Sequence, residues 1–112
     1  MAKIFSVVPL ELQPGITGED FVKFWLAEYA PLGQRLGWES HVLKADRGER
    51  VGQYAVIWEI PSTESRDQIM QGDGQLTEEG KRLLEPDFQV LNAKLETFIN
   101  GWPFTDYIEL GH

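Results

Sequence analysis

A stretch with helical spacing of apolar residues runs from Phe21 to Gly37, between two segments that resemble strands. Its aromatic and aliphatic positions recur every three or four residues and form one broad stripe, while the charged positions lie mostly on other arcs. Thr17 or Gly18 is expected to cap this helix at its start. Pro31 cannot donate a backbone hydrogen bond, so the helix should kink or restart there. Gly37 is expected to end it.

Four other stretches are rich in β-branched and aromatic residues, which is typical of strands. They cover residues 3–12, 38–45, 52–60 and 104–110. The second and third are separated by a short polar loop that contains glycine, and this predicts a β-hairpin. Apolar residues occupy both faces of the strands, so we expect the sheet to be covered on both sides.

Two further helical segments follow the hairpin. A short helix is expected from about Ser62 to Met70, and a longer helical stretch after Thr77 is expected to be interrupted at Pro86. The apolar residues after Pro86 recur at helical spacing, and they are Phe88, Leu91, Leu95, Phe98 and Ile99. The order β-α-β-β-α-β, with one extra helical piece, predicts an α+β fold of the ferredoxin-like class.

That fold places four strands in one antiparallel sheet with the helices on one face only. The opposite face would then be exposed although it is apolar, and a large exposed apolar face implies a partner. A symmetric homodimer hides the same face on both subunits. The sequence therefore predicts two sheets packed face to face.

The composition narrows the classes of function. A chain of 112 residues with 42% hydrophobic residues is expected to form a single globular domain, residues 1–112. The formal net charge of -8 argues against nucleic acid or an anionic membrane as a partner. The chain has no cysteine, no signal peptide pattern and no stretch long enough to span a membrane. We expect a cytoplasmic protein.

A motif in the helix resembles the EthD-like branch of the dimeric α+β barrel proteins. Members of that branch typically show an aromatic pair, then His-Ala-Pro-Leu, then leucine and glycine before the second strand. This chain matches at three places, which are Phe24-Trp25, Ala30-Pro31-Leu32 and Leu36-Gly37. The resemblance implies a dimer with a ligand cleft between sheet and helices. It also implies activities that include cofactor-free oxygenation of aromatic polyketides, cyclisation and haem degradation.

Two residues are candidates for proton transfer. Tyr29 stands where the EthD-like motif has histidine, and a tyrosine, with an ordinary pKa of about 10, is a poorer base at neutral pH. His41 is the only histidine inside the chain, since His112 is the last residue. His41 is either a general acid or base in a cleft or an ordinary histidine at a dimer surface.

Several aromatic side chains are candidates for contacts with a flat ligand. Trp25 and Trp58 could instead belong to the hydrophobic core. This interpretation is favoured because large aromatic side chains contribute most to core packing. Tyr29 and Tyr54 fit a ligand site and the packed interior equally well, because a buried tyrosine hydroxyl needs a hydrogen-bond partner that a ligand can supply. Tyr107 is a further candidate. Asp106 is unusual inside an apolar strand, where burial would raise its pKa toward a useful value. The favoured interpretation is that it faces solvent or caps a backbone group, because aspartate is seldom buried.

Two hypotheses on function remain open. In the first, a cleft binds a hydrophobic, aromatic or polyketide-like small molecule and performs cofactor-independent oxygenation, cyclisation or isomerisation, with His41 and Tyr29 in the site. In the second, the protein is a binding or dimeric assembly module without turnover. We expect no cofactor and no dedicated metal site, because the sequence has no cysteine and no recognisable spacing of histidines and carboxylates.

Overall fold

The computed structural model describes residues 2–111 and contains one four-stranded antiparallel sheet with the strand order β2-β3-β1-β4. The strands are β1 (Ile4–Pro9), β2 (Glu39–Lys44), β3 (Tyr54–Ile60) and β4 (Thr105–Ile108). The helical segments are α1 (Gly18–Phe24), the π-helix η1 (Trp25–Tyr29), α2 (Ala30–Gln34), α3 (Thr63–Ile69), α4 (Glu78–Leu84) and α5 (Asp87–Leu95). This is the predicted ferredoxin-like α+β fold.

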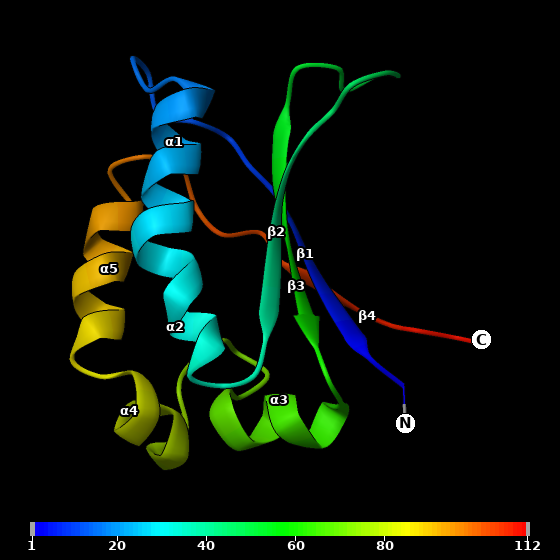
Figure 1. Ribbon diagram of the computed structural model, residues 1–112, viewed down its shortest axis with the longest axis vertical. Helices are drawn as coiled ribbons and strands as arrows, with labels where there is room; N and C mark the ends of the chain where they lie inside the picture. The colour runs from blue at the N-terminus through cyan, green and yellow to red at the C-terminus, as the bar shows by residue number, and fades with distance from the viewer. Residues whose placement is uncertain (1, 112) are drawn as a thin grey trace.

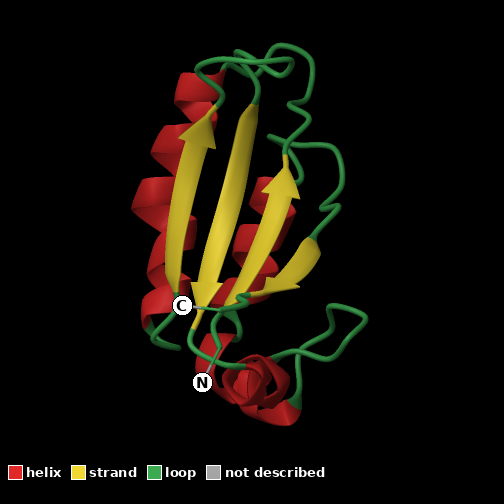
Figure 2. Ribbon diagram, turned by 90° about the vertical axis from the view of Figure 1, so that its right-hand side faces the viewer, coloured by secondary structure: helices red, strands yellow, loops and turns green. Residues whose placement is uncertain are grey.

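The helices lie on one side of the sheet. In Figure 1, α1, α2 and α5 form a layer beside the strands, while α3 and α4 close one end. Figure 2 shows the opposite face of the sheet with no helix in front of it. The two-layer arrangement predicted from the order of elements is confirmed, and it leaves one sheet face uncovered. None of the helices within residues 2–111 is long and apolar enough to cross a bilayer.

The predicted central helix is built from α1, η1 and α2 without a gap. It starts where expected, because the hydroxyl of Thr17 accepts a hydrogen bond from the backbone N–H of Asp20. Its hydrogen bonding widens before Pro31, where the N–H of Ala30 reaches back to the carbonyl of Trp25. The predicted break at Pro31 is therefore a π-helical turn just upstream of it. Gly37, at φ 73°, follows the last turn as predicted.

The register of the sheet decides which side chains face the helices. Strands β2 and β3 pair as the predicted hairpin, with Ser40 opposite Trp58 and Val42 opposite Val56. On β1, Ile4, Ser6 and Val8 lie opposite Ile60, Trp58 and Val56, so they share this inner face. The alternate positions point to the uncovered face.

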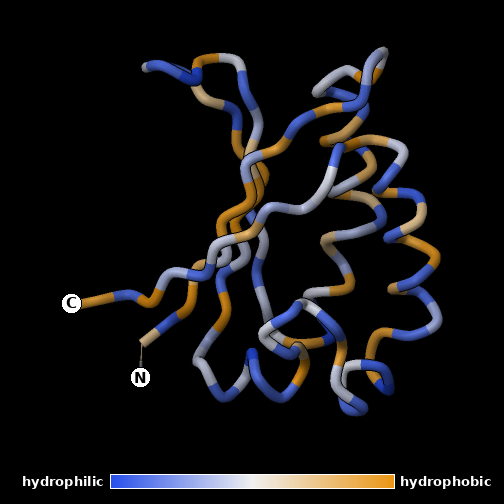
Figure 3. Tube along the Cα trace, turned by 180° about the vertical axis from the view of Figure 1, so that it is seen from behind, coloured by the Kyte–Doolittle hydropathy of each residue, from blue (hydrophilic) through white to orange (hydrophobic). Residues whose placement is uncertain are grey.

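The core lies between the inner sheet face and the helices. Its fully buried members are large apolar side chains, which include Ile4, Val8, Phe21, Trp25 and Val56. Figure 3 shows hydrophobic positions along the central strands and recurring at intervals along the helices. The periodic residues after Pro86 also join this core, as Leu95 and Ile99 are buried and Phe88, Leu91 and Phe98 pack against them.

The strands are shorter than the sequence pattern predicts. The first ends at Pro9. In the segment that follows, the N–H of Leu10 still bonds to the carbonyl of Tyr54 in β3, and Leu12 forms an isolated bridge with Ile99, just after α5. The last contains only Thr105–Ile108 of the expected 104–110. The pattern overestimates strand length because apolar residues continue into the segments that pack beside the sheet.

Candidate functional site

A cavity of about 500 Å³ opens between the inner face of the sheet and the helix layer. It is bounded by β1, β3 and β4 on one side and by residues of η1, α2, α3 and α5 on the other, with the segments 70–74 and 99–104 at its edge. Its volume is within the range of small-molecule sites in proteins, which is about 300 to 1,000 Å³. Most of the lining is apolar or aromatic, with a few polar groups among it.

One row of residues across the sheet forms the floor. From β2 to β4 the row reads Ser40, Trp58, Ser6 and Asp106, because these residues are direct partners in the three strand pairs. Ser6, Trp58 and Asp106 line the cavity. Ser40 instead accepts a hydrogen bond from the indole N–H of Trp25 at 3.1 Å. Two hydroxyls and a carboxylate are therefore placed in an otherwise apolar sheet face.

The helix wall contributes a hydrogen-bonded pair. The hydroxyl of Tyr29 donates to Oδ1 of Asn92 at 2.6 Å, which joins η1 to α5, and both residues line the cavity. Tyr29 is only 7% exposed and stacks on Trp25 with 4.6 Å between the ring centres. Burial raises the pKa of Tyr29 well above its ordinary value. Tyr29 is thus a neutral hydrogen-bond donor and not a base.

A second polar group closes the opposite side of the cavity. Nη1 of Arg66, from α3, lies 3.2 Å from Oδ2 of Asp106, and its Nε lies 3.0 Å from Oδ1 of Asp67. The hydrogen bond to Asp67 is the main cause that raises the pKa of Arg66 above its usual value. All three residues line the cavity. Asp106 is therefore paired and faces inward, which corrects the expectation that it faces solvent or caps the backbone.

Trp58 is held against the helix layer by a glycine. A Cβ atom at Gly33 would lie 2.2 Å from Cζ3 of Trp58, so only glycine lets α2 approach the indole this closely. Trp58 also contacts the rings of Trp25 and Trp38, at 5.5 and 6.3 Å between centres. Its position, and with it one boundary of the cavity, is fixed by packing on several sides.

The structure brings together only two of the six residues expected in a site. Tyr29 and Trp58 line the cavity. Trp25 is fully buried beneath them and belongs to the core. The ring of Tyr54 lies over Gly18, where a Cβ would meet it at 2.1 Å, and near Nζ of Lys44. Neither Trp25 nor Tyr54 borders the cavity.

His41 and Tyr107 are on the uncovered face of the sheet. His41 pairs with Ile57, and Tyr107 with Phe5, at the positions that alternate with the floor of the cavity. Their side chains are well exposed, and the sheet separates them from Tyr29. A site in which His41 and Tyr29 act on one substrate within a single chain is not assembled here. His112 lies outside the described residues.

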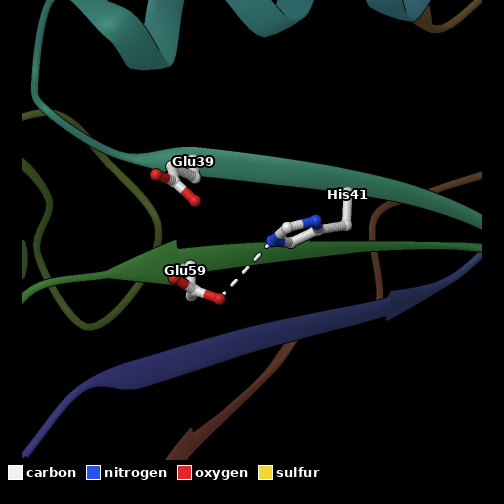
Figure 4. A group of neighbouring side chains, drawn as sticks. All are labelled: Glu39, His41 and Glu59. Carbon is white, nitrogen blue, oxygen red and sulfur yellow. Dashed lines mark ion pairs between the residues drawn. The ribbon is translucent and has the colours of Figure 1, made fainter.

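His41 does have neighbours of its own. Its Nε2 lies 3.5 Å from Oε1 of Glu59, and Glu39 stands two residues away on the same strand (Figure 4). These three residues are the described group whose ligand atoms are close enough to hold a metal ion. The sequence hides this group because Glu59 comes from the neighbouring strand. Nζ of Lys3 also pairs with Glu59 at 3.3 Å, and a cation at that carboxylate opposes metal binding.

Most of the polar groups of the cavity carry no signal in the sequence. Ser6, Arg66 and Asn92 have ordinary spacing in the chain, and only the strand register and the packing of α3 and α5 bring them to one place. Trp102 also lines the cavity and stacks on Trp25 with 5.8 Å between ring centres. Of the residues that the sequence singled out, Tyr29, Trp58 and Asp106 border this cavity.

No protein-family model and no curated protein sequence matches the chain. Solved structures do match it along nearly its whole length. An uncharacterised NIPSNAP domain protein from Burkholderia xenovorans has a TM-score of 0.66 and 11% identity, covering 96% of this chain and 94% of that one. At3g17210 from Arabidopsis thaliana has a TM-score of 0.65 and 13% identity over 97% of each chain.

A NIPSNAP family protein from Agrobacterium tumefaciens, Atu5224, has a TM-score of 0.63 and 18% identity, covering 98% of this chain and 93% of that one. At such low identities the likeness establishes the ferredoxin-like α+β fold and carries no activity with it. Several of these neighbours are NIPSNAP proteins, and the EthD-like branch indicated by the helix motif is not confirmed.

Proposed function

We propose that the protein binds a flat, largely apolar small molecule, of the aromatic or polyketide-like class, in the cavity between sheet and helices. The observation that carries this proposal is the composition of the cavity. Its volume is about 500 Å³, its surface is mainly aromatic and aliphatic, and polar groups converge on it from both layers. Binding sites for small molecules have this combination, since apolar surface supplies affinity and a few polar groups fix orientation.

The polar groups define how a ligand would be held. Tyr29 and Asn92 lie on the helix side, while Ser6 and the pair Arg66–Asp106 lie toward the sheet. A planar ligand between them would lie near the indole rings of Trp58 and Trp102. We propose binding as the function, and any cofactor-independent oxygenation, cyclisation or isomerisation would have to use groups of this cavity. His41 is on the other face of the sheet, so it is not part of this proposal.

A thermal-shift panel tests the proposal. The compounds are phenols, flat polycyclic aromatics, fatty acids, flavin and haemin. A ligand present at 100 times its dissociation constant adds about 2.7 kcal/mol to the folded state. In a domain of this length that raises the melting temperature by roughly 10 °C. We expect flat aromatic compounds to give such a rise and the other classes to give less.

A blocked variant serves as the control. Gly72 lines the cavity, a Cβ there meets no atom within 4 Å, and its φ is not in the left-handed region. Gly72→Trp should therefore fold and narrow the cavity, so the thermal shift should fall. Val90→Trp, at an exposed position of α5 outside the cavity, should keep the shift of the wild type. Equal shifts in all three proteins would place the ligand elsewhere and refute the proposal.

The uncovered sheet face supports a second candidate function, that of a dimeric assembly module. Its central positions are apolar, and they are Phe5, Val7, Leu43, Ala55, Ile57 and Tyr107. A patch of this kind in the middle of a sheet favours a second copy over solvent. The EthD-like motif of the helix agrees with this arrangement. We propose a homodimer of single-domain chains, residues 1–112, with His41 in the dimer interface.

Sedimentation velocity tests the homodimer. Ile57 is at the centre of the uncovered face, on a central strand opposite Val7. Because a symmetric dimer carries each substitution twice, Ile57→Lys would bury two positive charges facing each other in the interface. The variant should therefore sediment as a monomer. Lys is tolerated there in the monomer because the position faces solvent. If the wild type sediments as a monomer even at a concentration of about 100 μM, this second function is excluded.

A further inference from the structure

The charges around the cavity are unequal. Arg66 is the one cation among the described lining residues, while Asp67, Glu96 and Asp106 are carboxylates, so the lining has a formal net charge of -2. The chain as a whole is also negative, with a formal net charge of -8. Partly enclosed charges are weakly screened, because the low-dielectric walls concentrate their field.

The guanidinium of Arg66 is already engaged. Its Nε pairs with Asp67 at 3.0 Å and its Nη1 with Asp106 at 3.2 Å. An anionic ligand would have to displace one of these carboxylates or bind next to them, where the like charges repel it. An uncharged hydroxyl meets no such obstacle, because it can donate a hydrogen bond to a carboxylate and accept one from the guanidinium.

Asp106 is the carboxylate that a ligand would meet. It projects from the floor of the cavity, beside Ser6 on the neighbouring strand, and its side chain is less exposed than that of Asp67 (22% against 66%). Arg66 binds its Oδ2. The carboxylate of Asp67 lies mostly in solvent, where its field is screened.

From these contacts we infer that Asp106 makes the cavity selective for uncharged or cationic aromatic ligands and against aromatic carboxylates. The inference rests on the proposed function and adds the class of ligand. Asp106 acts by its charge and by occupying Arg66. When Asp106 is neutral, the charge of the guanidinium is less compensated and the cavity has one negative charge less, so a carboxylate becomes acceptable.

Three naphthalene probes of the same shape test it by isothermal titration calorimetry at pH 7 and low salt. They are naphthalen-2-ol, naphthalene-2-carboxylate and naphthalen-2-ylmethylammonium. The wild type should bind the naphthol and the ammonium compound, and the carboxylate at least about ten-fold more weakly, a factor that corresponds to one charge interaction in a partly enclosed site. In Asp106→Asn the naphthol and carboxylate affinities should come within about three-fold of each other.

Two further variants complete the test. Glu28→Gln removes a carboxylate that pairs with Lys94 outside the cavity, so it should keep the selectivity of the wild type. Arg66→Gln should shift the selectivity the other way, with the carboxylate bound still more weakly, and it keeps the inference testable if Asp106→Asn does not fold. Circular dichroism confirms that each variant is folded.

The outcomes distinguish failure of the selectivity from failure of the proposed binding function. If the wild type binds the carboxylate as tightly as the naphthol, the selectivity is wrong and the proposed cavity function stands. If Asp106→Asn folds and retains the ten-fold difference, Asp106 is not its source. If none of the probes binds and the thermal-shift panel is also flat, the proposed function fails and the inference fails with it.

Discussion

Removing the hydroxyl of Tyr29 should change the stability of the protein in opposite directions at neutral and at high pH. At neutral pH, Tyr29→Phe removes the 2.6 Å hydrogen bond to Asn92. Asn92 borders the cavity and is only partly buried, so water can reach the amide that is left. The loss should be about 1 kcal/mol of unfolding free energy, with a melting temperature lower by about 4 °C.

At high pH the difference in unfolding free energy between Tyr29→Phe and the wild type changes sign. Burial raises the pKa of Tyr29 in the folded protein, so the neutral phenol is favoured there. The stability that this contributes is complete below the unfolded tyrosine pKa of about 10 and is lost as the pH rises toward the folded pKa, because the unfolded chain releases the proton first. One pH unit above the unfolded pKa, the loss is about 1.4 kcal/mol. Phenylalanine does not suffer it.

Tyr29→Phe should therefore be less stable than the wild type at pH 7 and slightly more stable at pH 11. Urea unfolding at both values measures the difference, and the absorbance of tyrosinate near 295 nm follows ionisation in the folded state. Tyr107→Phe is the matched control, because Tyr107 is 57% exposed and should show no reversal. If the folded wild type ionises all three of its tyrosines near pH 10, or the reversal is missing, the account of Tyr29 as a buried donor is refuted.

Two substitutions test the local packing of the helix layer. Gly33→Ala places a Cβ 2.2 Å from Trp58, so the indole or α2 must move, and we expect a loss of about 1 to 3 kcal/mol with altered tryptophan fluorescence. Unchanged stability would mean that Trp58 has room to move. Thr17→Ala removes the cap that accepts from the N–H of Asp20, and thermal melts should show a loss of about 1 kcal/mol. Thr17→Asn, which keeps an acceptor, should stay close to the wild type.

The fold could be predicted from the sequence because its elements are encoded locally. The apolar stripe after Thr17, the break before Pro31 and the glycine at position 37 specify one helix with a defined beginning and end. Alternation in residues 54–58 assigns Ala55 and Ile57 to one face and their neighbours to the other, and the register confirms this assignment. Local rules such as these need no knowledge of distant contacts.

The site could not be predicted in the same way, because its residues meet only after the layers pack. His41 stood out as the single internal histidine, yet strand register turns it to the face opposite the cavity. Arg66 and Asp106 are 40 residues apart, and a hydrogen bond joins them between α3 and the first half of β4. A one-residue difference in register exchanges the two faces of a strand. Rarity of a residue type is therefore a weaker guide to the site than its face on the sheet.

If the cavity between sheet and helices is the binding site, a heteronuclear NMR titration with naphthalen-2-ol will show it. The chain has four tryptophans, whose indole N–H signals report on the two layers. The signals of Trp58 and Trp102, which line the cavity, should shift with a common dissociation constant, while the backbone signals of Leu43 and Tyr107 on the uncovered face stay in place. Shifts confined to the uncovered face, with both indole signals unmoved, would contradict the account.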